Sequence, residues 1–229
     1  MNGYAFTLAG VPLLALPSGA LHLHGAGILA VADLHLGKAT RLARRGGALL
    51  PPYETEATLA RLDADIAATR PARVICLGDS FDDMAAETET FEVHRLWLLR
   101  MMAGRDWVWI AGNHDPGPMS LGGTHRTTWR EGPLIFRHIA EPGAQGEVSA
   151  HYHPKWHLAG RMRPCFLADA TRVILPAYGT YTGGLAADDP ALAPLLGPNA
   201  VAILTGLRAL PVPLARRPQL RSGLPFRQR

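Results

Sequence analysis

Short apolar runs recur along the whole chain, and they have the length and composition of β-strands. Ten of these runs are expected to form strands, and the first is broken at Gly10-Val11-Pro12, which predicts a hairpin. The predicted strands cover residues 4–16, 20–24, 27–33, 73–79, 107–113, 133–138, 146–153, 165–169, 172–177 and 200–206.

Two stretches between the third and fifth predicted strands repeat their apolar residues at helical spacing. The first is residues 54–69, with Leu59, Leu62 and Ile66 on one face. The second is residues 87–103, with Phe91, Leu96, Leu99 and Met102. The first half of the chain therefore alternates strand and helix, which predicts a parallel βαβαβ unit.

From residue 133 onward the predicted strands follow one another through short turns, which predicts mixed or antiparallel sheet. No internal repeat and no low-complexity linker interrupts the chain before its last fifteen residues. We therefore expect an α/β fold in a single domain over residues 1–214, followed by a basic and flexible tail over residues 215–229.

The composition is that of a soluble globular protein, with 48% hydrophobic and 18% charged residues in a chain of 229. The only cysteines, Cys76 and Cys165, lie far apart without CxxC spacing. This argues against a disulfide scaffold or a thiolate zinc site and favours a reducing compartment. The apolar N-terminal region has no basic residue before Lys38 and is broken by Pro and Gly, so no signal peptide or membrane helix is predicted and a cytoplasmic location is expected.

The net charge of +4 is unevenly distributed, because residues 215–229 carry five arginines and no acid. The rest of the chain is slightly acidic, so the high isoelectric point of about 9.4 largely reflects the tail. A tail of this kind can contact nucleic acid phosphates. The alternative is a disordered end that only aids solubility.

Polar side chains follow several of the predicted strands directly, where ligands collect in an open α/β sheet. The residues are Asp33, His35, Asp79, Asp82, Asn113, His114, Asp115, His151 and His153. Asp33 and His35, like His151 and His153, are two apart, so each pair is expected to project from one face of an extended chain. Each motif alone also fits a capping residue, a turn or an exposed edge pair. Together they supply the carboxylate, imidazole and amide ligands that suit Mn, Fe or Zn.

The order D-x-H, G-D-x-x-D, G-N-H-D, a separate His and H-x-H resembles the motif series of the calcineurin-like metallophosphoesterase superfamily. More narrowly, "ADLHLGKA", "RHIAEPG", "HYHP" and "ILPAYGTYTGGL" resemble the bacterial ligase-associated DNA damage response endonucleases (PdeM-type proteins). The resemblance implies a four-layer α/β/β/α sandwich and metal-assisted phosphoester hydrolysis. It also implies a manganese-dependent DNA endonuclease that acts beside a repair helicase, a nuclease and a DNA ligase.

Carried over residue by residue, the resemblance implies two divalent ions, with manganese favoured and iron or zinc as alternatives. One ion would be held by Asp33, His35, Asp79 and His153. The other would be held by Asp79, Asn113, His138 and His151, with Asp79 as the bridge. His138 is chosen because it ends a predicted strand ahead of the H-x-H pair, whereas His125 falls in a Gly/Thr-rich loop and His157 follows the pair.

The same pattern makes His114 a catalytic group that serves the leaving oxygen, with Asp82 orienting its ring and Asp115 in a supporting position. Two residues depart from the pattern. Ala150 stands where the superfamily usually has Gly, which requires a negative φ there. Asp82 stands where repair nucleases often carry a second His, and Asp is the pattern of many phosphomonoesterases. A phosphatase or cyclic-nucleotide phosphodiesterase of small substrates therefore remains an alternative, and a non-catalytic scaffold is a third possibility.

Overall fold

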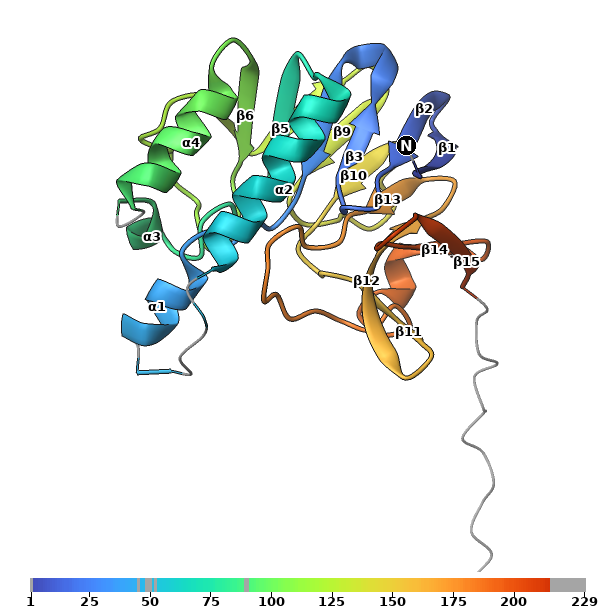
Figure 1. Ribbon diagram of the computed structural model, residues 1–229. Helices are drawn as coiled ribbons and strands as arrows, with labels where there is room; N and C mark the ends of the chain where they lie inside the picture. Colours follow the sequence, from blue (N-terminus) through green and yellow to red (C-terminus); the bar gives the residue numbers. More distant parts are fainter. Residues whose placement is uncertain (1, 45, 48–50, 52, 89–90, 215–229) are drawn as a thin grey trace, which may run out of the picture.

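The apolar runs pair into two mixed β-sheets that pack face to face (Figure 1). The computed structural model describes residues 2–44, 46–47, 51, 53–88 and 91–214. The predicted tail, residues 215–229, lies outside the described residues. Both sheets contribute to one shared core, so the prediction of an α/β fold in a single domain is confirmed.

The first sheet has its strands in chain order, antiparallel from β1 to β4 and parallel from β4 to β7. Its strands are β1 (Tyr4–Leu8), β2 (Val11–Ala15), β3 (Leu21–Leu23), β4 (Ile28–Val31), β5 (Arg73–Leu77), β6 (Asp106–Ile110) and β7 (Thr124–Arg126). The predicted hairpin at the start and the predicted parallel βαβαβ unit, β4 to β6, are both confirmed.

The second sheet runs in the order β15-β14-β12-β13-β10-β9-β8, with β11 paired to the free end of β12. Its strands are β8 (Thr128–Glu131), β9 (Leu134–Arg137), β10 (Glu147–Ser149), β11 (Lys155–Leu158), β12 (Arg161–Ala168), β13 (Arg172–Ile174), β14 (Val201–Leu204) and β15 (Leu210–Pro213). Strands β9, β10 and β13 are parallel and the other pairs are antiparallel, as the predicted mixed sheet requires.

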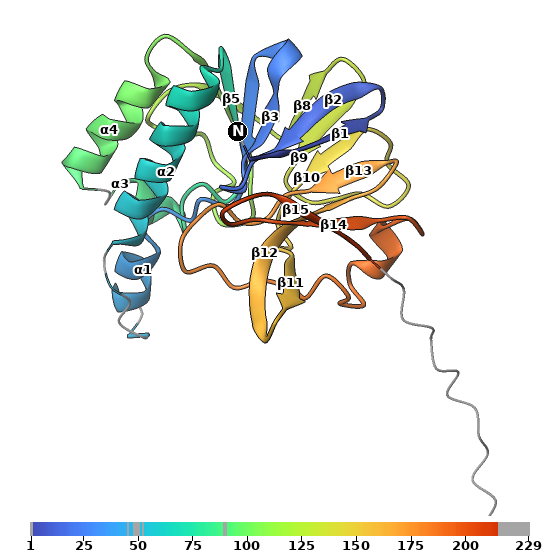
Figure 2. The same ribbon diagram turned by 45° about the vertical axis from the view of Figure 1, so that its right-hand side comes forward.

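The α-helices in the described part of the chain are α1 (Lys38–Arg44), α2 (Glu54–Thr69), α3 (Met84–Thr88) and α4 (Glu92–Met102). Of these, α2 and α4 lie on the outer side of the first sheet, and α1 and α3 lie beyond the ends of its strands, as Figure 2 shows from a second direction. Alternating residues of the central strands divide between two cores. Ile75 and Leu77 of β5 face the second sheet, whereas Val74 and Cys76 pack under the helices. Because both faces are covered, β4 is apolar throughout, and β5 and β6 are apolar after their first residues, Arg73 and Asp106.

The outer face of the second sheet is covered by a different kind of layer. Leu167 and Ala202 pack there against Leu192 and Leu195 of the segment around the short 3-10 helix η2 (Ala193–Leu195). In the described part of the chain, the fourth layer of the sandwich is thus a 3-10 helix with its flanking loops, and no α-helix lies on this face. The only other 3-10 helix among the described residues is η1 (His24–Ala26), which joins β3 to β4.

The buried face of α4 differs from the predicted one. Phe91 and Leu96 were expected to face the core but are 66% and 54% exposed, and Leu98 and Met101 are buried instead. The helix carries apolar residues around most of its circumference, so spacing alone does not decide which side packs. No described helix is both long enough and apolar enough to span a membrane.

Candidate metal centre

Five strands from both sheets end near one another, and the predicted ligand residues follow them directly. Strands β4, β5 and β6 of the first sheet are followed by Asp33, His35, Asp79, Asn113 and His114. Strands β9 and β10 of the second sheet are followed by His138, His151 and His153. All seven predicted metal ligands, together with His114, belong to one continuous network of contacts. The two sheets therefore build this site jointly.

Most of the predicted ligands stand on left-handed backbone. The φ angles of Asp33, His35, Asp79, His151 and His153 are 50°, 45°, 46°, 72° and 47°. The expectation that the D-x-H and H-x-H pairs project from an extended chain is therefore wrong, because these residues coil just beyond the strand ends. Non-glycine residues in this region are strained and concentrate at functional sites, where the surrounding structure holds them in place.

The first group of ligand atoms comes from Asp33, His35 and His153, whose candidate ligand atoms lie within 4.8 Å of one another. The His35 Nδ1 atom lies 2.8 Å from Oδ1 of Asp82, so this carboxylate lies against the ring, although the two atoms lack the geometry of a hydrogen bond. The Nε2 atom of His35 and Oδ1 of Asp33 are buried and make no hydrogen bond with any described residue. A buried imidazole beside a carboxylate, with its other nitrogen free, is the arrangement of a metal-ligating histidine.

The second group consists of Asp79, His138 and His151, and their ligand atoms also lie within 4.8 Å of one another. The His138 Nδ1 atom lies 2.8 Å from the carbonyl oxygen of Leu77, and because a carbonyl only accepts, Nδ1 carries the proton. The Nε2 atom then faces Asn113 Oδ1 at 3.1 Å, His151 Nδ1 at 3.2 Å and Asp79 Oδ2 at 3.3 Å. Four potential ligand atoms thus converge on one point.

The close packing of carboxylates and imidazoles shifts the pKa values of the site. Burial would raise the pKa of Asp79, but hydrogen bonding and charge from His138, with a smaller effect of His114, hold it well below its usual range. Burial likewise opposes protonation of His138, yet Asp79 and Asp33 raise the pKa of that imidazole to about 8. Two carboxylates directed at the same imidazoles concentrate negative charge, which a divalent cation would neutralise.

Asp79 is fixed by the segment that follows β6. Its backbone N–H donates to Oδ1 of the fully buried Asp115 at 2.9 Å, which gives Asp115 the predicted supporting role. Its Oδ1 atom accepts from the backbone N–H of His114 at 2.9 Å. Gly112 permits this approach, because a Cβ atom there would lie 2.1 Å from Oδ1 of Asp79. The glycine of the "GNHD" motif is therefore required by close packing against this carboxylate.

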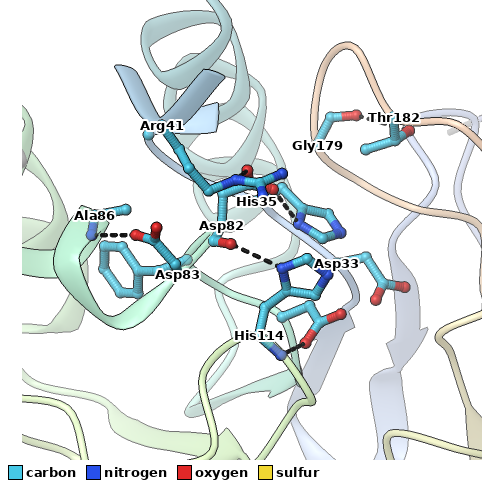
Figure 3. Close-up of polar contacts among 12 residues, drawn as sticks. Asp33, His35, Arg41, Asp82, Asp83, Ala86, His114, Gly179 and Thr182 are labelled. Atoms are coloured by element: carbon cyan, nitrogen blue, oxygen red, sulfur yellow. Dashed lines mark hydrogen bonds and ion pairs between the residues drawn. The ribbon is translucent and has the colours of Figure 1, made fainter. Parts of the chain in front are cut away.

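The predicted contact between the Asp82 carboxylate and His114 is wrong. The Asp82 carboxylate is fully buried and contacts His35 and the guanidinium of Arg41, as Figure 3 shows. His114 is instead oriented by the backbone carbonyl of Asp82, which lies 2.8 Å from its Nδ1 atom. Nδ1 of His114 therefore donates to this carbonyl, and its Nε2 atom takes no part in the contact. Arg41 was not predicted, since its helix α1 is too short to show a clear apolar period.

The competing histidines do not join the cluster. His125 lies in strand β7 rather than in a loop, and His157 lies exposed on β11. Neither belongs to any group of potential ligands among the described residues. The structure thus places His138, and not these two, beside Asp79. The alanine at position 150 is also accommodated, because Ala150 is not among the residues with positive φ.

Comparison with known proteins identifies the family to which this geometry belongs. The sequence profile of the calcineurin-like phosphoesterases matches residues 26–179, which is more than half of the chain. The chain belongs to the calcineurin-like phosphoesterase family. A solved structure of the nuclease MPE from Pseudomonas putida is similar, with a TM-score of 0.74 and 29% sequence identity, over 92% of this chain and 100% of that one. No curated protein matches the sequence.

Membership of this family agrees with the chemistry of the cluster, so the chain is a metal-dependent phosphoesterase. The donor set of carboxylates, imidazoles and an amide oxygen fits divalent ions of intermediate hardness. The buried Nε2 of His35 and Oδ1 of Asp33 make no hydrogen bond with a described residue, and such an ion would satisfy both atoms. The residues present are thus suited to hold the metal that the family implies.

Proposed function

We propose that the protein is a binuclear-metal phosphodiester hydrolase, and more specifically a DNA endonuclease of DNA repair. The observation that carries the hydrolase proposal is the pair of ligand groups that meet at Asp79. Asp79 is grouped with His138 and His151 on one side and with His35 and His114 on the other. The proposal of DNA as substrate is supported by the similarity to a nuclease over nearly the whole chain.

The proposed first ion is held by Asp33, His35, Asp79 and His153, and the second by Asp79, Asn113, His138 and His151. When bound, two such ions act as Lewis acids on the phosphate and lower the pKa of the attacking water. Manganese is the proposed metal, with iron and zinc as alternatives of similar ligand preference. The protein contributes fixed positions for the ligands, since the left-handed backbone and the buried Asp115 leave Asp79 little freedom.

His114 is the proposed catalytic proton donor. Its Nδ1–H is held by the carbonyl oxygen of Asp82, so protonation places the mobile proton on Nε2. From there it can be given to the oxygen that leaves phosphorus. Asp82 acts by positioning His35 through its carboxylate and His114 through its backbone.

The second candidate function is a phosphatase or cyclic-nucleotide phosphodiesterase of small substrates. The presence of Asp at position 82, rather than a second His, favours it. The buried contact of Asp82 with His35 and Arg41 is compatible with either function, because it supports the ligand set and not the substrate.

A repair endonuclease of this kind would act in the cytoplasm beside a repair helicase, a second nuclease and a DNA ligase. Both thiols, Cys76 and Cys165, are buried and free, which suits a reducing compartment. The arginines of residues 215–229 would contribute contacts to DNA phosphates.

A hydrolysis panel with manganese separates the two functions. Single-stranded DNA, duplex DNA, a cyclic nucleotide and a generic chromogenic diester are compared for the wild type and for Asp79→Ala, which controls for contaminating nucleases. We expect metal-dependent cleavage of DNA that is lost in Asp79→Ala. Turnover of the cyclic nucleotide, with DNA left intact, would instead establish the second function.

A further inference from the structure

A pocket of about 460 Å³ opens directly beside the second group of ligand atoms. Asn113 and His138 form its wall toward the proposed metals, and Thr128 of β8, Ile139 and Glu141 line its other side. Its volume lies within the range of ~300–1,000 Å³ that is usual for small-molecule sites. Ile139 is 45% exposed and offers an apolar surface. A substrate that reaches past the metals can therefore enter this pocket.

Arg137 lines the same pocket and forms an ion pair with Glu141, and its Nε atom lies 3.6 Å from Oε2 of the buried Glu147. The Glu141 side chain is 68% exposed, whereas the Arg137 side chain is 11% exposed. The backbone of Glu141 is held on both sides: its N–H donates to Oε2 of Glu147 at 2.9 Å, and its carbonyl accepts from Nη1 of Arg172 at 3.1 Å. The Glu141 side chain can thus leave Arg137 while the loop stays in place.

A phosphate is a strong competitor for Arg137. The Glu141 carboxylate is well solvated once it leaves, because its side chain is 68% exposed, so a pair of this kind contributes little to stability from the Glu141 side. A guanidinium binds phosphate through two parallel charge-assisted hydrogen bonds, which are stronger than those between neutral groups. Glu141 therefore occupies the position of an anionic ligand and is easily displaced by one.

We propose that this pocket binds the nucleotide on one side of the scissile phosphate, and that Arg137 binds the next phosphate of the strand in place of Glu141. The inference rests on the proposed nuclease function and adds a subsite on the β8–β9 side of the centre. The nucleotide packs its sugar or base on Ile139, and the strand continues past Arg137. A small phosphomonoester ends at the scissile phosphate, so this subsite favours polynucleotide chains.

The first test is Glu141→Gln, which keeps the side-chain size and removes the competing charge. We expect the ratio of the KM for single-stranded DNA to the KM for methyl p-nitrophenyl phosphate to fall about two- to fivefold, the usual effect of one exposed charge pair. The matched control is Asp106→Asn. Asp106 is 69% exposed and paired with Arg73 at 2.9 Å, but it lies at the opposite end of β6 from Asn113. This control makes the same change of net charge and should leave the ratio unchanged.

The second test is Thr128→Trp, which fills the pocket from an exposed position of β8 where an aromatic residue suits a strand. We expect kcat/KM on DNA to fall roughly tenfold or more relative to kcat/KM on the small diester, as for a pocket that excludes its ligand group. Circular dichroism and metal content verify that the variant is folded and loaded.

Two results would overturn the subsite. One is an equal fall in the KM ratio for Glu141→Gln and Asp106→Asn, because the effect would then be general electrostatics. The other is a Thr128→Trp protein that cleaves DNA as well as the wild type does. If the wild type hydrolyses the small diester but cleaves no DNA, the nuclease function itself is wrong, and the subsite is rejected with it.

Discussion

The identity of the ligands could be predicted from the order of short motifs, but the way each is held could not. Asp33 and His35, like His151 and His153, were expected on extended chain, yet each adopts positive φ just after a strand. Nothing in a single sequence marks a non-glycine residue for the left-handed region. The partner of Asp82 was also assigned incorrectly, since the sequence does not show whether His35 or His114 lies beside this carboxylate.

His114 is expected to matter for turnover and not for metal binding. The His114→Ala protein should fold, bind metal as the wild type does, and lose turnover by ~10²–10⁴, the usual contribution of a positioned proton donor. The measurement is kcat on substrates with poor leaving groups, combined with elemental analysis. An unchanged rate on such substrates would remove His114 from the mechanism.

Asp82 is expected to act through His35. Substituting Asp82→Asn removes the charged partner of His35 Nδ1, so metal affinity should fall ~10–100-fold, as for other partners of ligating histidines. Manganese titration by calorimetry measures the change. Asp83→Asn is the matched control, because the adjacent Asp83 contacts Arg44 and lies outside the ligand groups. Equal losses in both variants would contradict the assigned role.

At the scale of elements, alternation of strand and helix was enough to predict the parallel unit, whose strands are followed by four of the seven proposed ligands. The lengths of the apolar runs also gave the strands of both central sheets. The buried face of α4, the short helices α1 and α3, and the short strands β7, β8, β11 and β15 escaped prediction. Their residues are either apolar on several sides or largely exposed, so packing between elements decides their structure and local pattern does not.

The loop after β6 packs against Asp79 through Gly112, and we expect a side chain at position 112 to disturb this contact. Gly112→Ala places a Cβ where Oδ1 of Asp79 lies, so the carboxylate or the loop must move. We expect loss of metal and a lower melting temperature. Gly25→Ala is the control, because no atom lies within 4 Å of its added Cβ and its φ is not positive. A Gly112→Ala protein with full metal content would show that this close packing is not required.

At the scale of the whole molecule, two sheets contribute ligands to one centre. No single motif in the sequence indicates this convergence, and only the order of all the motifs together does. The basic tail is a separate feature of the sequence. Its contribution to DNA binding is a prediction that rests on charge alone, since residues 215–229 lie outside the described residues.

Truncation after Leu214 tests the tail. If Arg216, Arg217, Arg221, Arg227 and Arg229 contact phosphates, the truncated protein should bind DNA more weakly. Its log–log salt slope should fall by ~0.7 per lost contact on single strands or ~0.9 on duplex. Hydrolysis of a small chromogenic diester should be unaffected, because the proposed ligands lie in the sheets. Equal affinity and equal slope for both proteins would leave the tail as a solubilising end.

The central claim is that one carboxylate, Asp79, joins two metal sites. Elemental analysis of manganese-saturated protein, before and after Asp79→Ala, tests it most directly. We expect two ions per chain in the wild type and loss of both in Asp79→Ala, while His114→Ala keeps them. A folded Asp79→Ala protein that retained its full metal content would contradict the binuclear centre.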